Sequence, residues 1–221
     1  MILVLAESAL ELVPRELWRH PAILADARRR GKRPGEMLLD RARHHPAMYG
    51  LAKAERRGRP DIVHQVLLAF QYSFHTRRGM GRAYVHTRDG YVIAVDPRAR
   101  VPKNYNNFVS LVEQLYALGR VPPRSEPLME LHRKELGDLL SELGGRWVVF
   151  HESGSRKPLY EIGSEILKSV VVVGGFPHGD FENKWVLERA AARYGLGEES
   201  LDAVQVVCRA VAAAEMAAGL V

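Results

Sequence analysis

The sequence has few of the features that mark secreted or membrane-bound proteins. A single cysteine, Cys208, excludes an internal disulfide, and its alanine- and valine-rich surroundings predict a small, buried and unreactive side chain. No apolar run reaches the roughly 20 residues that a membrane-spanning helix needs. The first residues, MILVLAESALELVP, lack a basic leader and a small-residue cleavage site. We therefore expect a cytoplasmic protein without a membrane partner.

Several catalytic and binding motifs are also missing. The dinucleotide motif G-x-G-x-x-G does not occur, and no G-K-[ST] follows a glycine-rich turn as it does in a phosphate-binding loop. The nine histidines include the neighbours His44 and His45, but none form an H-x-x-x-H pair beside a carboxylate motif. We expect no metal site, and a metalloenzyme is the least favoured interpretation.

Acidic residues are in the minority. The chain has 26 Asp and Glu against 32 Lys and Arg, a net charge of +6, which favours a polyanionic partner and nucleic acid above all. The arginines cluster at RRRGKR (28–33) and ERRGRPD (55–61). The first cluster is equally typical of a cationic helix end closed by Gly31.

With 221 residues, 47% of them hydrophobic, the chain is long enough for one domain, 1–221, with an internal extension at about 80–98. Patterns of apolar residues, prolines and glycines predict the elements. These are a strand at 2–7, a helix at 14–30 broken at Pro21, helices at 35–45 and 47–58, an apolar run of undecided type at 62–73, a hairpin at 81–96 turning at Asp89-Gly90, a helix at 108–119, a loop at 122–127, a helix at 128–145, a strand at 146–153, a short helix near 166–169, a strand at 170–173, a helix at 182–194, a loop at 195–200 and a helix at 201–219.

Buried strands that alternate with helices indicate an α/β fold around a largely parallel sheet, with the hairpin as an addition. Ligands of such sheets bind beyond the carboxyl ends of the strands. VVVVGGFPHGDF (170–181) is a buried strand followed by a loop in which Gly174, Gly175 and Gly179 allow sharp turns and close backbone approach. The pattern fits a ligand-binding loop, and it also fits a plain strand-to-helix turn.

The final helix is apolar almost all the way round, with Ala203, Val204, Val207 and Val211 among its members. Such a helix must be buried on most sides. A subunit interface and the interior of one domain explain it equally well.

Two polar segments in the middle of the chain favour RNA. GRPDIVH (58–64) contains Arg59, Asp61 and His64, and ARVPKNYNNF (99–108) brings together basic, amide and tyrosine side chains. Arginine grips phosphate through paired hydrogen bonds, and a nearby carboxylate can fix its rotamer. Taken singly, Arg59 and Asp61 also fit a surface ion pair, and His64 fits a core histidine.

Seven segments occur in the order known from one family: LVLAESALELVP, LLDRARHHPAM, RGRPDIVH, YVHTRDGYVIAVDPRARVPKNYNNFVSLVEQL, VPPRSEPL, GGFPHGDF and SLDAVQVVCRA. The chain resembles, over nearly its whole length, the archaeal pseudouridine N1-specific methyltransferases of the small ribosomal subunit, SPOUT-class enzymes that act in ribosome biogenesis. The resemblance implies an α/β fold with a C-terminal trefoil knot, an exception to the rule against knots. It also implies a homodimer, S-adenosylmethionine as cofactor, and small-subunit rRNA and ribosome assembly factors as partners.

The resemblance also implies the site residues. The cofactor would lie against Gly174, Gly175 and Gly179 and against Leu196, Gly197, Glu198, Glu199, Ser200 and Leu201, near His151 to Gly154. RNA would contact Arg59, held by Asp61, together with Arg100, Lys103 and Asn107. The family usually has arginine where Lys103 and Asn107 stand, which implies a weaker or differently placed grip on phosphate. SFHTR (73–77) and GEESL (197–201) also depart from the family pattern.

The implied reaction is transfer of a methyl group to pseudouridine N1, with Arg59 and Asp61 as catalytic residues. The N1 proton would go to Asp61, Asp180 or water, and adjacency assigns Asp61 first to orienting Arg59. A non-catalytic rRNA-binding assembly factor that keeps the fold is the alternative.

Overall fold

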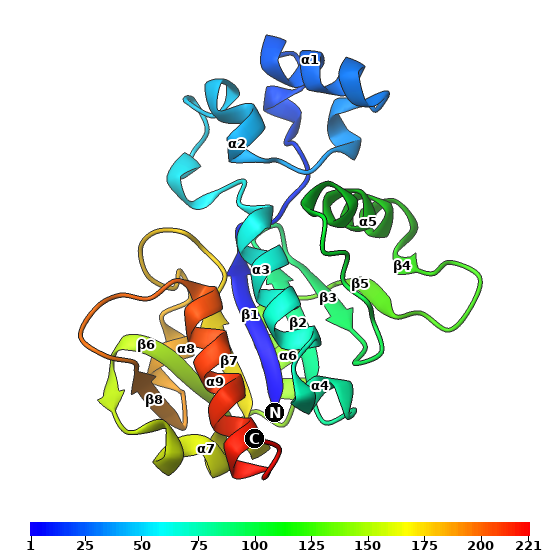
Figure 1. Ribbon diagram of the computed structural model, residues 1–221. Coiled ribbons are helices and arrows are strands. Elements are labelled where there is room, and N and C mark those ends of the chain that lie inside the picture. Colours follow the sequence, from blue (N-terminus) through cyan, green and yellow to red (C-terminus); the bar gives the residue numbers. More distant parts are fainter.

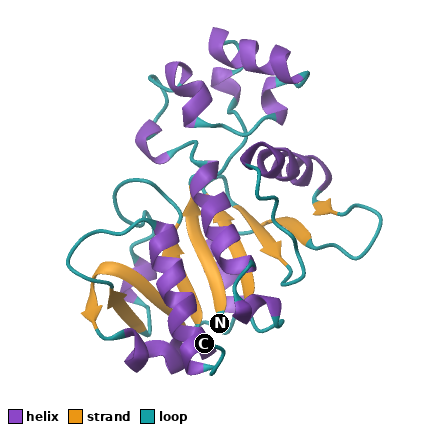
Figure 2. Ribbon diagram, viewed as in Figure 1, coloured by secondary structure: helices purple, strands orange, loops and turns teal.

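The most apolar segments of the chain form the middle of an eight-stranded sheet. The computed structural model describes residues 1–221, and the strands lie in the order β4-β5-β3-β2-β1-β7-β6-β8 (Figures 1 and 2). Their bounds are β1 Ile2–Ser8, β2 Arg82–Thr87, β3 Tyr91–Val95, β4 Arg120–Val121, β5 Met129–Arg133, β6 Trp147–Arg156, β7 Val170–Gly174 and β8 Ala192–Gly195. The strands from β2 to β8 in this order are parallel, whereas β3, β5 and β4 add antiparallel pairs. The predicted α/β class is confirmed, but β4 and β5 make the antiparallel edge larger than a hairpin.

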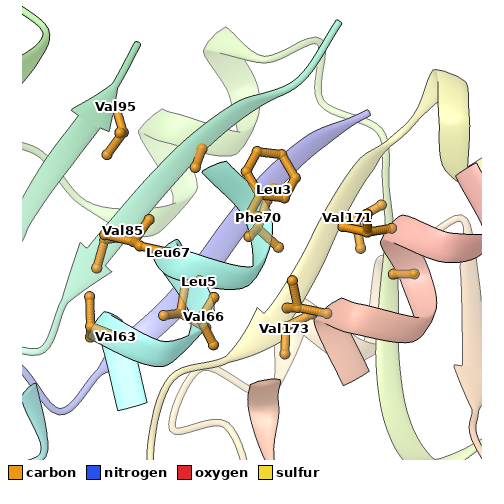
Figure 3. Packing of buried hydrophobic residues seen from close by; sticks show 14 of the residues in the cluster. Leu3, Leu5, Val63, Val66, Leu67, Phe70, Val85, Val95, Val171 and Val173 are labelled. Carbon is orange, nitrogen blue, oxygen red and sulfur yellow. The ribbon is translucent and has the colours of Figure 1, made fainter. Parts of the chain in front are cut away.

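Side chains of the central strands alternate between two cores, as the two-residue period of a strand requires. Leu3, Leu5 and Val173 belong to the larger core, and Val4 and Val172 belong to the smaller one. Figure 3 shows the larger core, where α3 packs Val63, Val66, Leu67 and Phe70 against β1 and its neighbours. Burial on both faces explains why these strands are continuous apolar runs in the sequence.

Helices cover both faces of the sheet. Their bounds are α1 Pro21–Arg30, α2 Arg41–His44, α3 Pro60–Gln71, α4 Phe74–Arg77, α5 Tyr105–Leu118, α6 Leu136–Glu142, α7 Leu159–Lys168, α8 Trp185–Glu188 and α9 Ala203–Ala217. Residues of α3, α5, α7 and α9 build the larger core, and residues of α6 and α8 build the smaller core. The apolar run at 62–73, undecided from the sequence, is α3, which begins with a proline at its first helical position.

The segment between β1 and α3 forms a small helical region above the sheet (Figure 1). It has its own apolar cluster, which includes Ile23, Met37 and Met48. The predicted break at Pro21 is confirmed, because α1 begins there. The helices predicted at 35–45 and 47–58 are wrong: only α2 and single 3-10 turns form, and Lys53 adopts a left-handed conformation with φ 54°.

Two further predicted helices are wrong because strand pairing replaces part of each. In the segment 128–145, β5 pairs with β3 and only α6 is helical. In the segment 182–194, α8 is a single turn, and β8 pairs in parallel with β6. The helix near 166–169 is longer than predicted, since α7 begins at Leu159.

The final helix buries one face in the larger core, through Val207, Ala210 and Val211 among others. It packs closely on α7, where an added Cβ at Gly163 would lie 2.5 Å from the carbonyl oxygen of Ala213. Cys208 is exposed, so its predicted burial is wrong for the single chain. None of the helices has the length and apolar character needed to cross a membrane.

Candidate active site

A cleft of about 770 Å³ lies beyond the carboxyl end of β7; we refer to it as the main cleft. Its walls come from residues 150–152 of β6, from residues 173–181 without Gly175, and from Arg59, Ile62 and Gln65 next to or on α3. The segment after β7 is faced by residues 194, 196, 199–204 and 206. About half of the lining residues are hydrophobic, and both the size and the mixed lining are typical of small-molecule sites.

Most of the residues predicted to hold a cofactor border the main cleft. Gly174 and Gly179 contribute from the loop after β7, and Leu196, Glu199, Ser200 and Leu201 contribute from the segment after β8. His151 borders the cleft as well, whereas Gly154 packs its backbone against Tyr194. Two segments about twenty residues apart in sequence thus face each other across the cleft.

Gly175, Gly197 and Glu198, also predicted cofactor residues, do not line the main cleft. The Gly175 amide donates to the carbonyl of Ala6 at 2.8 Å, and its carbonyl accepts from the Ala9 amide at 2.9 Å. An added Cβ at Gly175 would lie 2.4 Å from Ser8 Oγ. Gly175 therefore lets the loop lie against the end of β1, which shapes the cleft from behind.

Asp180 presents an ionised carboxylate to the main cleft. Its Oδ1 lies 3.1 Å from His151 Nε2, and Lys184 Nζ donates to its Oδ2 at 2.7 Å. Burial alone would raise the pKa of Asp180, but hydrogen bonds from Lys184 and from the Phe181 amide, with the nearby His151, lower it overall. Asp180 is therefore negatively charged at neutral pH.

Arg59 and Asp61 form a bidentate ion pair at the start of α3. Arg59 Nε and Nη2 each donate to one carboxylate oxygen of Asp61 at 2.8 Å, and the hydrogen bonds raise the pKa of Arg59. About a third of each side chain is exposed. Arg59 borders the main cleft and Asp61 does not. The predicted ion pair is confirmed, and both oxygens of Asp61 are occupied by it.

The side chains of Arg100, Lys103 and Asn107 are exposed near the start of α5. Lys103 Nζ lies 5.6 Å above the ring of Tyr72. His64 of α3 is buried; its Nε2 lies 2.7 Å from the carbonyl oxygen of Pro102, and its ring stacks on Phe108. His64 is thus a core histidine that ties α3 to this segment. Through His64, the segment that holds Arg100 and Lys103 is linked to α3, the helix that Arg59 precedes. We refer to these three predicted RNA-binding cations together as the basic face.

Sequence reasoning missed two charged residues behind the loop after β7. Glu7 is the second-last residue of β1 and is 7% exposed, and the Arg56 guanidinium lies 4.3 Å from the ring centroid of Phe176. A buried carboxylate is rare unless it is paired, so a glutamate within an apolar strand is the available signal.

Both of these residues line a second hollow, of about 350 Å³. Its lining has no hydrophobic residue and includes His86, Arg88 and Glu135. A wholly polar hollow lacks the apolar surface that small-molecule sites usually provide. The main cleft is therefore the better candidate for a cofactor.

Known proteins match the chain along its whole length. A protein of Pyrobaculum aerophilum named ribosomal RNA small subunit methyltransferase Nep1 is 78% identical over 220 residues, covering 100% of both chains. A protein of the same name from Staphylothermus marinus is 41% identical over 217 residues, 96% of this chain and 94% of the other.

The crystal structure of Archaeoglobus fulgidus Nep1 bound to S-adenosylhomocysteine superimposes with a TM-score of 0.87 at 39% identity, covering 99% of this chain and 98% of that one. A family model described as EMG1/NEP1 methyltransferase matches residues 3–215. These matches confirm the resemblance to archaeal small-subunit rRNA methyltransferases. The chain belongs to the EMG1/NEP1 methyltransferase family.

Proposed function

We propose that this protein transfers a methyl group from S-adenosylmethionine to N1 of a pseudouridine in small-subunit rRNA, in the course of ribosome biogenesis. The observation that carries the proposal is that Arg59, one of the predicted RNA contacts, lines the main cleft. A cofactor in the cleft and an RNA loop on the basic face would therefore come together at one place. The names of the relatives support the substrate class, and the ligand of the Archaeoglobus fulgidus structure supports the cofactor.

The lining of the main cleft fits S-adenosylmethionine. Gly174 and Gly179 bring the backbone to the cleft without a side chain, and Tyr194 and Val206 offer apolar surface to a nucleoside. We assign direct contacts to Gly174, Gly179, Leu196, Glu199, Ser200 and Leu201. Gly175, Gly197 and Glu198 would act by shaping the segments that carry these residues.

Bound S-adenosylmethionine would supply a sulfonium methyl group, whose carbon a nucleophile can attack in line while S-adenosylhomocysteine leaves. The protein's part is to hold N1 of the base within reach while the N–C bond forms, the C–S bond breaks and the N1 proton leaves. Asp180 lines the cleft as a charged carboxylate, whereas Asp61 lies outside the lining and pairs with Arg59. We therefore assign acceptance of the proton to Asp180, directly or through water, and the orientation of Arg59 to Asp61.

The RNA would bind across the basic face. Arg59, with its rotamer fixed by Asp61, and the free charges of Arg100 and Lys103 suit phosphate groups. Asn107 would offer a neutral amide. The target base must be unpaired or flipped to reach the cleft.

We extend the proposal to the assembly and the chain path. A homodimer through α9 would cover Cys208 and Met216, which are exposed apolar or weakly polar side chains on a largely apolar helix. We propose a trefoil knot at the C-terminal end from the family resemblance alone. One domain, 1–221, would hold all of these parts.

The test is methyl transfer from labelled S-adenosylmethionine to two small-subunit rRNA stem-loops that differ only in carrying uridine or pseudouridine at one loop position. Label on the pseudouridine RNA alone is the expected result. RNA binding without transfer to either stem-loop would overturn the proposal in favour of a non-catalytic assembly factor.

A further inference from the structure

Glu7 has a backbone conformation that few residues adopt. Its φ of 51° lies in the left-handed region, and the pairing of β1 with β2 shifts in register between Leu5 and Ser8. Such a conformation costs a non-glycine residue on the order of 1–3 kcal/mol and persists only where the surroundings enforce it. The Glu7 side chain contacts the loop after β7.

The Glu7 carboxylate is almost fully enclosed by donors from the far end of the loop after β7. Oε2 accepts from the Glu182 amide at 2.7 Å, and Oε1 accepts from the Asn183 amide at 2.8 Å and from Asn183 Nδ2 at 2.9 Å. Arg56 Nη2 lies 3.4 Å from Oε2. Hydrogen bonds to a charged acceptor are roughly twice as strong as hydrogen bonds between neutral groups.

Arg56 holds the middle of the same loop. Its guanidinium lies over the ring of Phe176, and Nη1 donates to the carbonyl oxygen of Asp180. Nη1 also lies 3.1 Å from where a Cβ of Gly179 would be, so a side chain there would press on the guanidinium. The Arg56 side chain is 13% exposed, and Glu7 and Glu182 both lie within 4 Å of it.

Glu7 and Arg56 thus contact the loop at Phe176, Asp180 and residues 182–183, yet neither lines the main cleft. The opposite side of the same loop forms a cleft wall. We propose that Glu7 and Arg56 are positioning residues that clamp the loop 174–183 in the shape that binds the cofactor. The inference rests on the proposed function, because it takes the main cleft as the cofactor site.

A neighbouring ion pair provides a control that distinguishes a positioning role from a general contribution to stability. Arg57 donates to Glu11 through Nε at 2.8 Å and through Nη2 at 2.5 Å, with side-chain exposures of 11% and 6%. This pair is as buried as the clamp, but none of its hydrogen bonds reaches the loop 174–183. Removing one partner of a buried pair destabilises a fold in either case.

The experiment compares Glu7→Gln, Arg56→Lys and Arg56→Met with the matched control Arg57→Met. Glutamine would turn an NH₂ group toward donors, and lysine would keep the charge but lose the second arm that reaches Asp180. For each protein we would measure the dissociation constant for S-adenosylhomocysteine by calorimetry, the thermal midpoint, the affinity for the rRNA stem-loop, and KM for S-adenosylmethionine.

We expect the three clamp variants to bind S-adenosylhomocysteine at least about tenfold more weakly, a loss of roughly 1.4 kcal/mol, and to raise KM for the cofactor in parallel. RNA affinity should stay within about twofold, and Arg57→Met should lose thermal stability without losing ligand affinity. If Arg56→Met does not fold, Arg56→Lys and Glu7→Gln carry the test.

The inference is overturned if the folded clamp variants bind the ligand as the wild type does. It is also overturned if Arg57→Met weakens ligand binding as much as they do. Failure of the wild type to bind S-adenosylhomocysteine is a different result: it would refute the proposed function, and this inference with it.

Discussion

Alanine at Gly175 tests whether the back of the loop after β7 governs the main cleft. An added Cβ would lie 2.4 Å from Ser8 Oγ and 2.9 Å from both Leu5 Cγ and the Ser8 backbone. These contacts are too short for any real Cβ, and Ser8 cannot move freely because its hydroxyl donates to the Leu5 carbonyl at 3.0 Å. The loop must therefore shift away from the end of β1.

Overpacking of this kind costs about 1–3 kcal/mol. For a chain of this length a loss of 1 kcal/mol lowers the thermal midpoint by about 2–4 °C, so a fall of roughly 4–8 °C is expected for a cost near the middle of that range. The shift also moves Gly174, which lines the main cleft, so ligand affinity should fall. Because Gly175 itself does not line the cleft, any loss of affinity reports on the shape of the loop.

The assay is thermal unfolding of Gly175→Ala with and without S-adenosylhomocysteine. Gly50→Ala is the control, since nothing lies within 4 Å of an added Cβ there and its φ is not positive. Gly50→Ala should keep the midpoint or raise it slightly by restricting the unfolded chain. A Gly175→Ala protein that unfolds and binds ligand as the wild type does would refute the steric argument.

Three further outcomes follow from the structure. Gly163→Ala should destabilise the fold by about 1–3 kcal/mol in denaturant titrations, because its Cβ would meet the α9 backbone; unchanged unfolding would contradict the packing of α7 on α9. The steepness with which log affinity for rRNA falls against log salt concentration reflects the number of phosphate contacts. Arg59→Ala should lower this slope by about one, and Asn107→Arg should raise it by about one. Slopes equal to that of the wild type would mean that the phosphates lie elsewhere. The folded-state pKa of Asp180 lies below its ordinary value of 3.8, so its charge stabilises the fold above that value and the contribution is lost as pH falls through the folded-state pKa. Asp180→Asn should therefore lose less unfolding free energy than the wild type as the pH falls into the acid range. The same loss in both proteins would contradict the lowered pKa of Asp180.

The elements that the sequence predicts well are those with a strong local signal. β1 is a run of buried aliphatic residues, and the hairpin of β2 and β3 turns at Asp89-Gly90, with Gly90 at φ 79°. α5 ends at Gly119, which adopts the left-handed conformation of a helix terminus. In each case the pattern and the tertiary environment favour the same structure.

The missed strands depend on partners that are distant in the sequence. β5 pairs with the open edge of β3, and β8 pairs with β6, about forty residues earlier in the sequence. Strand preference is weak without its neighbours, so the helix-forming residues of both segments misled the prediction. The helical region before α3 fails for a related reason, because its apolar side chains fill a cluster of their own without regular helices.

The sequence also predicts only part of the candidate site. Glycines after a buried strand indicate a loop that a ligand can approach, and Gly174 and Gly179 do border the main cleft. The sequence cannot separate Gly174 from Gly175, because which of two adjacent residues faces the cleft depends on how the loop lies on β1. Nor can it pair Glu7 with Arg56, which stand 49 positions apart.

The placement of charge behind the loop has a physical logic. A cofactor that contacts mainly backbone groups depends on the shape of the loop that carries them, and glycines make that loop flexible. Apolar packing fixes position only loosely, whereas hydrogen bonds to a buried carboxylate fix both distance and direction. Glu7 and Arg56, which do not line the cleft, therefore hold in place a loop that its glycines make flexible. The left-handed backbone of Glu7 is the conformational cost of aiming its carboxylate at Glu182 and Asn183.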